Sequence, residues 1–260
     1  MTEYHRLALF GDPVEHSRSP EIHRALLSLS ELEGEYGVVR ADRALLAEAV
    51  GELRDGAWSG LNVTMPLKAD AAELADRLAP EAARAGSVNT LANRDHEVVG
   101  HSTDATAFSM LFEDPRFGGL DEILVLGAGG SAAAALGMLG RSSTVYVSAR
   151  RDQAVRDLVA RMGGEPIPWE TAVVGALVIN TTPLGMRGEE LPDPVLDSAL
   201  GLIDLPYASE PTPAVARSIE KGTPVADGHE FLVRQAIVSF GIWTGVDVPY
   251  ESVLAELRKT

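Results

Sequence analysis

Apolar and polar residues alternate along this chain in short blocks, which predict strands and helices in turn. Strand-length apolar runs in the first hundred residues lie at 7–10, 36–39, 61–64, 88–92 and 98–101. Stretches with helical spacing lie between and after them, at about 20–30, 43–53, 67–78 and 103–112. Asn93-Arg94-Asp95 predicts a hairpin turn between the fourth and fifth strands. The alternation predicts an α/β fold.

The second half of the chain restarts this pattern. Strand-like runs lie at 122–126, 144–148, 176–180, 202–205 and 224–226. Two helices are expected at about 230–244 and 250–258. A strand, a glycine-rich turn and an alanine-rich helix in succession are typical of a nucleotide-binding sheet. We therefore predict two α/β domains around a cleft.

The glycine-rich turn Gly127-Ala128-Gly129-Gly130-Ser131-Ala132 follows the first strand of this second half. Gly127 permits a tight turn, Gly129 lets the backbone approach a pyrophosphate, and the following helix offers free N–H groups. Ala132 replaces the third glycine of the usual pattern and is small enough for helix–strand packing. A plain tight turn is the alternative.

The next strand ends in Arg150 and Arg151, where an NAD site usually has a carboxylate. Two guanidinium groups suit the 2′-phosphate of NADP. Asp152 keeps NAD possible, and an ordinary solvated charge cluster is the other alternative. We predict NADP as the cofactor.

Polar residues in the first half predict a binding site for a small acid. Ser17 and Ser19 would face the same side of an extended segment. Ser19 precedes Pro20 and resembles a helix N-cap, so capping could be its whole role. Two hydroxyls beside a helix N-terminus would bind a carboxylate without adding charge.

Lys68 is expected in the first turn of a helix that begins at Pro66. A cation there opposes the helix dipole, which favours a lysine used in proton transfer over a solvated one. Thr64 shares a strand face with Asn62. Asn89 and Asp104 are expected at element ends, where they could converge with Lys68, although Asp104 could also be an N-cap.

Composition excludes several classes of function. A net charge of −16 and the absence of cysteine argue against nucleic acid, anionic membranes, disulfides and thiolate metal sites. No apolar run is long enough for a membrane span, and the first residues do not resemble a signal peptide. We expect a cytoplasmic protein, a monomer or homodimer, that binds small molecules and no metal.

The ordered motifs together resemble the shikimate dehydrogenase family over nearly the whole chain. The matching segments are Ser17–Pro20, Asn62–Lys68, Gly86–Thr90, Gly127–Ala132, Asn180–Met186, Asp204–Tyr207, Asp227-Gly228 and Leu232–Gln235. The resemblance implies a substrate-binding domain of residues 1–102 plus 236–260 and a Rossmann-like NADP domain of residues 103–235. It also implies reduction of 3-dehydroshikimate to shikimate, in aromatic amino-acid biosynthesis.

The resemblance also implies roles for individual residues. Lys68 would be the catalytic acid and base, paired with Asp104. Ser17 and Ser19, with Tyr207 nearby, would hold the substrate carboxylate. The ring hydroxyls would be bound by Thr64, Asn89, Asp104 and Gln235. Cofactor contacts would come from Gly127–Ala132, Arg150, Arg151, Thr181, Met186 and Gly228.

The chain departs from the family pattern at several positions. Ser102 and Ala107 stand where the family usually has asparagine and glycine, and Ala149 and Arg151 differ from the usual asparagine and threonine. These departures leave a quinate/shikimate or aminoshikimate dehydrogenase using NAD or NADP as an alternative. A dinucleotide-binding sensor is disfavoured because Lys68 and Asp104 are both present. A folate-processing dehydrogenase is not supported by the paired serines.

Overall fold

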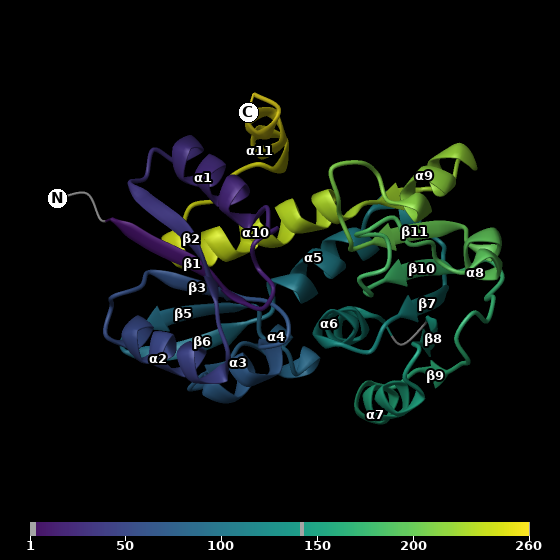
Figure 1. Cartoon of the computed structure of the whole chain (residues 1–260), viewed down its shortest axis with the longest axis horizontal. Helices are drawn as coiled ribbons and strands as arrows, with labels where there is room; N and C mark the ends of the chain where they lie inside the picture. The colour runs from purple at the N-terminus through teal and green to yellow at the C-terminus, as the bar shows by residue number, and fades with distance from the viewer. Residues whose placement is uncertain (1–3, 141–142, 260) are drawn as a thin grey trace. The chain divides into compact units, whose positions relative to one another are not determined.

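The computed structural model describes residues 4–140 and 143–259. It divides into two compact units, one made of Met1–Thr106 and Val233–Thr260 and the other of Ala107–Leu232. The chain leaves the first unit within helix α5 (Thr103–Phe112) and returns to it within helix α10 (Gly228–Thr244). Both units combine a sheet with helices, which confirms the predicted α/β class (Figure 1).

The first unit contains a six-stranded sheet in the order β2-β1-β3-β5-β6-β4. Its strands are β1 (His5–Gly11), β2 (Gly34–Arg40), β3 (Gly60–Val63), β4 (Arg77–Leu78), β5 (Thr90–Arg94) and β6 (Glu97–His101). β1 is parallel to both β2 and β3, whereas β5 is antiparallel to both β3 and β6. The sheet is therefore mixed. The carboxyl ends of β1, β3 and β6 lie at the same edge of the sheet as the amino end of β5.

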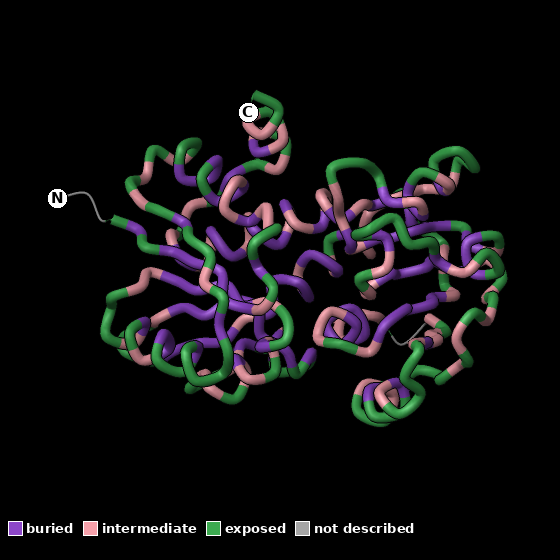
Figure 2. Tube along the Cα trace, viewed as in Figure 1, coloured by how far each residue is buried: buried purple, intermediate pink, exposed green. Residues whose placement is uncertain are grey.

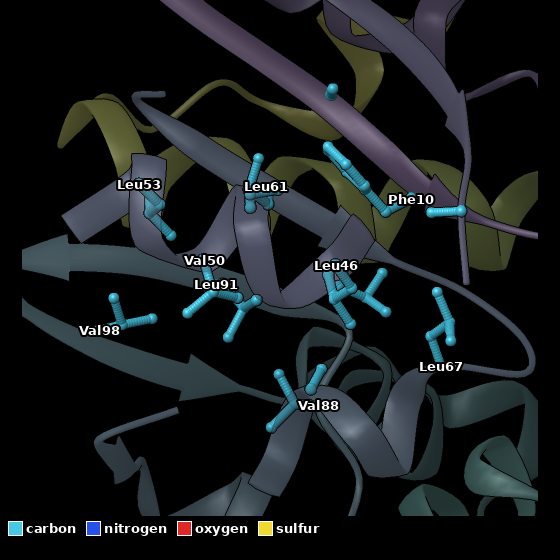
Figure 3. Close-up of a cluster of buried hydrophobic side chains, with 14 of the residues drawn as sticks. Phe10, Leu46, Val50, Leu53, Leu61, Leu67, Val88, Leu91 and Val98 are labelled. Carbon is cyan, nitrogen blue, oxygen red and sulfur yellow. The ribbon is translucent and has the colours of Figure 1, made fainter. Parts of the chain in front are cut away.

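Apolar residues on both sides of β1 explain why it lies inside this sheet. Ala8 and Phe10 belong to one core cluster, which includes residues of helix α2 (Arg43–Arg54) (Figure 3). Leu7 and Leu9 belong to another. The buried residues of α2 are Leu46, Ala49, Val50 and Leu53, the spacing of one helical face. The other helices that lie wholly in this unit are α1 (Ser19–Leu29), α3 (Lys68–Leu74), α4 (Pro80–Ala85) and α11 (Tyr250–Leu257).

The helix predicted over 67–78 is wrong in its last four residues. α3 ends at Leu74, and Ala75 is extended with φ −71° and ψ 141°. The Asp76 carboxylate accepts a hydrogen bond from Val98 N at 2.8 Å, and β4 then pairs with β6. Sheet pairing with a distant segment therefore overrides the local helical preference of this alanine-rich stretch.

The second unit contains a parallel sheet in the order β12-β11-β10-β7-β8-β9. Its strands are β7 (Glu122–Leu126), β8 (Thr144–Ser148), β9 (Glu165–Pro166), β10 (Leu177–Asn180), β11 (Gly201–Asp204) and β12 (Val225–Ala226). Numbered within this unit, the order is the reverse reading of 3-2-1-4-5-6, the doubly wound arrangement of dinucleotide-binding domains.

Helices cover this sheet and bury its central strands. They are α6 (Gly130–Met138), α7 (Asp152–Met162), α8 (Asp193–Ser198), α9 (Pro213–Glu220) and the short 3₁₀ helix η1 (Pro115–Phe117). Every residue of β10 and β11 is buried (Figure 2), which explains the continuous apolar runs in the sequence. In the described residues, no helix has the length and apolar character to cross a bilayer.

Candidate active site

The strand directions in the first unit bring four polar loops to one edge of the sheet. Asn62 of β3 lies opposite Thr90 of β5, which lies opposite His101 of β6. The loops after β1, β3 and β6 therefore meet the loop that precedes β5. These loops carry the predicted substrate residues, including Ser17, Thr64 and Asn89.

Lys68 and Asp104 form an ion pair at this edge. Lys68 Nζ lies 2.5 Å from Asp104 Oδ2, and the two side chains are 16% and 7% exposed. Lys68 is the first residue of α3, whose N-cap is Leu67, so the predicted helix start at Pro66 is wrong by two residues. Lys68 is thus neither a solvated surface lysine nor isolated, and Asp104 lies inside α5 rather than at its N-cap.

Asn89 and Gln235 adjoin this ion pair. Asn89 Nδ2 donates to Asp104 Oδ1 at 3.1 Å and lies 3.4 Å from Gln235 Oε1. Asn89 and Gln235 are 4% and 7% exposed. The structure therefore brings together four of the predicted residues, Lys68, Asp104, Asn89 and Gln235, in one continuous set of contacts.

Ser17 and Ser19 lie side by side at the start of α1, and the predicted N-cap Ser19 is instead the first residue of the helix. Their hydroxyl oxygens are 3.1 Å apart, and Ser17 Oγ accepts from Ser19 N at 3.2 Å. The N-cap is Arg18, whose side chain makes no capping bond and instead binds Glu21. Capping therefore does not account for the Ser19 hydroxyl.

Thr64 follows β3 directly and is half-buried. Its backbone N–H donates to the carbonyl of Phe10 at 2.9 Å. A Cβ at Gly11 would lie 2.4 Å from Thr64 Cγ2, so glycine is needed for this close approach. The loops after β1 and β3 are therefore packed tightly against each other.

A buried group of hydroxyls and amides below Asn89 was not predicted. Thr90, Thr103 and Ser239 have mutual oxygen–oxygen distances of 2.8, 3.1 and 3.3 Å. Asn62 Nδ2 lies within hydrogen-bond distance of Thr90 and Ser239. One signal was available, because Ser239 lies four residues after Gln235 and therefore on the same helical face.

The glycine-rich turn of the second unit has the conformation that a dinucleotide site requires. Gly127 has φ +115°, and a Cβ there would lie 2.3 Å from Thr181 Oγ1. Gly129 is the N-cap of α6, and no atom lies within 4 Å of a Cβ built there. Ala132 is completely buried. The open space at Gly129, beside the first N–H groups of α6, fits a pyrophosphate.

Arg150 and Arg151 follow the neighbouring strand and are exposed. Leu126 of β7 pairs with Ser148 of β8, so the arginines and the glycine-rich turn follow the carboxyl ends of adjacent strands. Asp152 is the first residue of α7. This placement fits an adenosine 2′-phosphate bound by the two guanidinium groups.

Thr181, predicted to bind the cofactor, forms a hydrogen bond with the last residue of β7, just before the glycine-rich turn. Thr181 Oγ1 donates to the carbonyl of Leu126 at 2.8 Å. Its neighbour Asn180 donates to Asp204 Oδ1 at 2.7 Å, and Thr212 donates to Asp204 Oδ2 at 2.5 Å. Burial raises the pKa of Asp204 to about 6, although the hydrogen bonds from Thr212 and Asn180 act to lower it.

The remaining predicted residues of the second unit lie on loops and a helix start. Met186 is 41% exposed. Tyr207 is half-buried, with its ring 5.4 Å from that of His229. A Cβ at Gly228 would lie 2.4 Å from the carbonyl oxygen of Leu205, so Gly228 permits close backbone packing at the start of α10.

Comparison with known families matches both ends of the chain. Residues 9–91 match the shikimate dehydrogenase substrate binding domain, and residues 228–258 match the shikimate 5′-dehydrogenase C-terminal domain. A shikimate dehydrogenase (NADP(+)) from Archaeoglobus fulgidus is 36% identical over 97% of this chain and 98% of its own. One from Alkalilimnicola ehrlichii is 35% identical over 97% and 98%.

Solved structures show the same similarity over the whole chain. A shikimate 5-dehydrogenase from Thermus thermophilus in complex with NADP(H) and shikimate is 30% identical, with a TM-score of 0.85 over 98% of this chain and 99% of its own. A shikimate dehydrogenase from Aquifex aeolicus is 27% identical, with a TM-score of 0.85 over 98% of both chains.

Proposed function

The chain belongs to the shikimate dehydrogenase family, and we propose that it catalyses the reversible NADP-dependent reduction of 3-dehydroshikimate to shikimate. The observation that carries this proposal is the Lys68–Asp104 ion pair, with Nζ and Oδ2 2.5 Å apart and Asn89 beside it. A lysine held by a carboxylate beside amide groups is suited to proton transfer to a bound polyol acid.

Lys68 acts on the carbonyl or hydroxyl oxygen attached to the reacting ring carbon of the substrate. NADPH, when bound, would supply a hydride to that carbon, and NADP⁺ would accept one. During reduction the Lys68 ammonium gives one proton to the carbonyl oxygen as it becomes a hydroxyl. During oxidation the neutral amine takes that proton back. Asp104 holds the amine in place in both directions through their hydrogen bond.

Polar side chains, most of them in the first unit, bind the substrate in this proposal. We assign the carboxylate to the hydroxyls of Ser17 and Ser19, which lie 3.1 Å apart at the start of α1. A chain with a net charge of −16 repels small anions at long range, so local donors are needed. Thr64, Asn89, Asp104 and Gln235 are assigned to the ring hydroxyls, and Tyr207 to the carboxylate.

The second unit binds NADP in this proposal. The turn from Gly127 to Ala132 receives the pyrophosphate, and Arg150 and Arg151 receive the 2′-phosphate. Thr181, Met186 and Gly228 complete the set. Asp152 could bond a ribose hydroxyl instead, and NAD is therefore the alternative cofactor.

A second candidate is a quinate/shikimate or aminoshikimate dehydrogenase. It was suggested by Ser102 and Ala107, where the family usually has asparagine and glycine, and by Ala149, Arg151 and Asp152 after β8. In the structure Ser102 and Ala107 are 1% and 0% exposed. Ser102 precedes α5, and its Oγ accepts from Ala105 N at 3.4 Å, in the first turn of that helix. Asn89, Asp104 and Gln235, which we assign to the ring hydroxyls, are also buried, so the choice between the two substrates rests on the kinetic test.

Initial rates with shikimate and quinate, each with NADP⁺ and NAD⁺, test the function. We expect the highest kcat/KM for shikimate with NADP⁺. A higher value with quinate, or no turnover of shikimate with either cofactor, would contradict the proposal. We further propose that the enzyme works in the cytoplasm, where its dinucleotide is found, as a monomer or homodimer.

A further inference from the structure

Three buried hydroxyls form a layer beneath Asn89 in the first unit. They belong to Thr90 at the start of β5, Thr103 at the start of α5 and Ser239 in α10. Their exposed fractions are 0%, 1% and 0%. Burying a hydroxyl is unfavourable unless it is hydrogen bonded, so the directions of these bonds are strongly constrained.

Ser239 sets those directions. Its hydroxyl donates to the carbonyl of Gln235 at 3.1 Å, one helical turn earlier in α10. A hydroxyl has one hydrogen, so Ser239 Oγ can only accept from its other neighbours. Thr103 Oγ1 lies 3.1 Å away and Thr90 Oγ1 2.8 Å away. Ser239 Oγ is the nearer acceptor for the Thr103 hydrogen, and Gln235 Oε1, at 3.4 Å, is the other.

Thr103 in turn fixes the orientation of Asn89. With its hydrogen directed away, Thr103 Oγ1 accepts from Asn89 Nδ2 at 2.9 Å. The backbone N–H of Thr103 donates to Asn89 Oδ1 at 2.7 Å. Rotating the amide by 180° would break both bonds. Asn89 is thus held with its amino group toward the carboxylate of Asp104.

Asn89 in turn contacts the Lys68–Asp104 ion pair. Asn89 Nδ2 donates to Asp104 Oδ1 at 3.1 Å, which leaves Oδ2 for Lys68 Nζ at 2.5 Å. If the amide turned, its oxygen would face a carboxylate oxygen, and the two would repel each other. The carboxylate would then rotate or shift, and the amine would move with it.

We infer that Ser239 is a positioning residue, which holds Asp104 and Lys68 in their reactive orientation through Thr103 and Asn89. The inference rests on the proposed function, because it assigns Ser239 to the same reaction. Ser239 has no contact with the ion pair itself in this chain of bonds. Replacing Ser239 should therefore lower kcat, and the size of that decrease should depend on whether Asp104 is present.

The test compares Ser239→Ala with Thr244→Val. Thr244 is a matched control, since its hydroxyl also donates to the carbonyl four residues earlier in α10, at 2.8 Å. We expect kcat for shikimate to fall about tenfold in Ser239→Ala, as for the loss of one networked hydrogen bond. The KM for NADP⁺ should be unchanged, and Thr244→Val should keep wild-type kcat. Ser239→Thr should recover most of the loss.

The decisive arm repeats Ser239→Ala in an Asp104→Asn background. If Ser239 acts through Asp104, the added substitution should change kcat less than about twofold, because coupled residues are not additive. A full tenfold loss in that background, or wild-type kcat in Ser239→Ala, would overturn the inference. If Ser239→Ala does not fold, Ser239→Cys keeps the volume with a weaker bond, and the same comparison applies. Failure of the wild type to oxidise shikimate would instead refute the proposed function.

Discussion

Lys68 stands at a position where a helix disfavours a cation. It is the first residue of α3, next to the positive end of the helix dipole. The chain has lysine at 68, 221 and 259 alone. Asp104 compensates the charge from α5, 36 residues further along the chain. A conflict with local preference of this kind is expected at functional sites, and the contact with Asp104 compensates it.

Replacing Lys68 tests the chemical step. Lys68→Ala should reduce kcat by about 10²–10⁴, the range for a general acid or base, with little change in KM for shikimate. Lys68→Arg should be almost as inactive, because a guanidinium does not release its proton in proteins. Steady-state kinetics measure both, with Lys259→Ala as the control at an exposed lysine. Lys68→Ala with more than about a tenth of wild-type kcat would rule out the role.

The paired serines make a separate prediction about binding. Double substitution of Ser17 and Ser19 by alanine should raise KM for shikimate about 10- to 100-fold, since hydrogen bonds to a charged group are lost. The KM for NADP⁺ should stay within twofold. Ser28→Ala is the control, an exposed serine on the same helix. An unchanged KM for shikimate would mean that the serines serve α1 alone.

Much of this site follows from sequence at the residue scale, and the rest does not. Lys68, Asp104 and Asn89 stand out by residue type and by position at element ends. Ser239 is marked in the sequence only by its spacing of four residues from Gln235, which places both on one helical face. Its contacts with Thr90 and Thr103 span 149 and 136 residues. Hydrogen bonds between residues so far apart in the sequence form only when the sheet and helices are packed, so the sequence alone does not predict them.

At the scale of elements, the predicted strands and helices lie within two residues of the observed ones, except at the end of α3. β7 and β8 have the predicted bounds, and β1 and β6 differ by one or two residues. Apolar runs of four or five residues with turn residues on both sides determine strands well. The end of α3 depends instead on Asp76, which binds Val98 and Arg54 from other elements.

The turn after β8 makes a prediction about the cofactor. Arg150→Ala with Arg151→Ala should weaken NADP⁺ binding by about 1–3 kcal/mol through lost charge-assisted bonds. NAD⁺ binding should change much less, because NAD⁺ lacks the 2′-phosphate. Titration of nucleotide fluorescence measures both dissociation constants, and Arg161→Ala on α7 is the control. Equal weakening for the two nucleotides would show that the arginines do not read the 2′-phosphate.

The buried carboxylate of Asp204, between β10, β11 and α9, predicts how the free energy of unfolding changes with pH. Burial raises the pKa of Asp204 to about 6, above its value in the unfolded chain. The folded state therefore holds this proton more tightly, and stability from Asp204 decreases as pH rises from about 4 through about 6. Asp204→Asn should gain up to about 3 kcal/mol of unfolding free energy relative to wild type over that interval.

Urea unfolding at pH 4.5, 5.5, 6.5 and 7.5 measures that difference. The exposed residue Asp121, substituted by asparagine, is the control in the same unit. Contributions from other titrating groups cancel when variant and wild type are compared at each pH. A difference that stays constant from pH 4.5 to 7.5 would contradict the predicted proton uptake by Asp204.

At the scale of the whole molecule, each unit has its own core and its own sheet. The first unit carries the serines, the ion pair, Asn89 and Gln235, whereas the second carries the glycine-rich turn and the arginines. This division follows from the position of each motif along the chain. The chain as a whole has a net charge of −16, so anion binding in either unit depends on local donors.

Thermal unfolding with each ligand tests this division of labour. A ligand at 100 times its dissociation constant stabilises the folded state by about 2.7 kcal/mol, so shikimate and NADP⁺ should each raise the unfolding temperature of the wild type. The Ser17→Ala/Ser19→Ala enzyme should lose the response to shikimate and keep the response to NADP⁺. The Arg150→Ala/Arg151→Ala enzyme should show the opposite pattern, because each substitution removes donors from one unit. Loss of both responses in either double variant would mean that the two sites cannot be assigned to separate units.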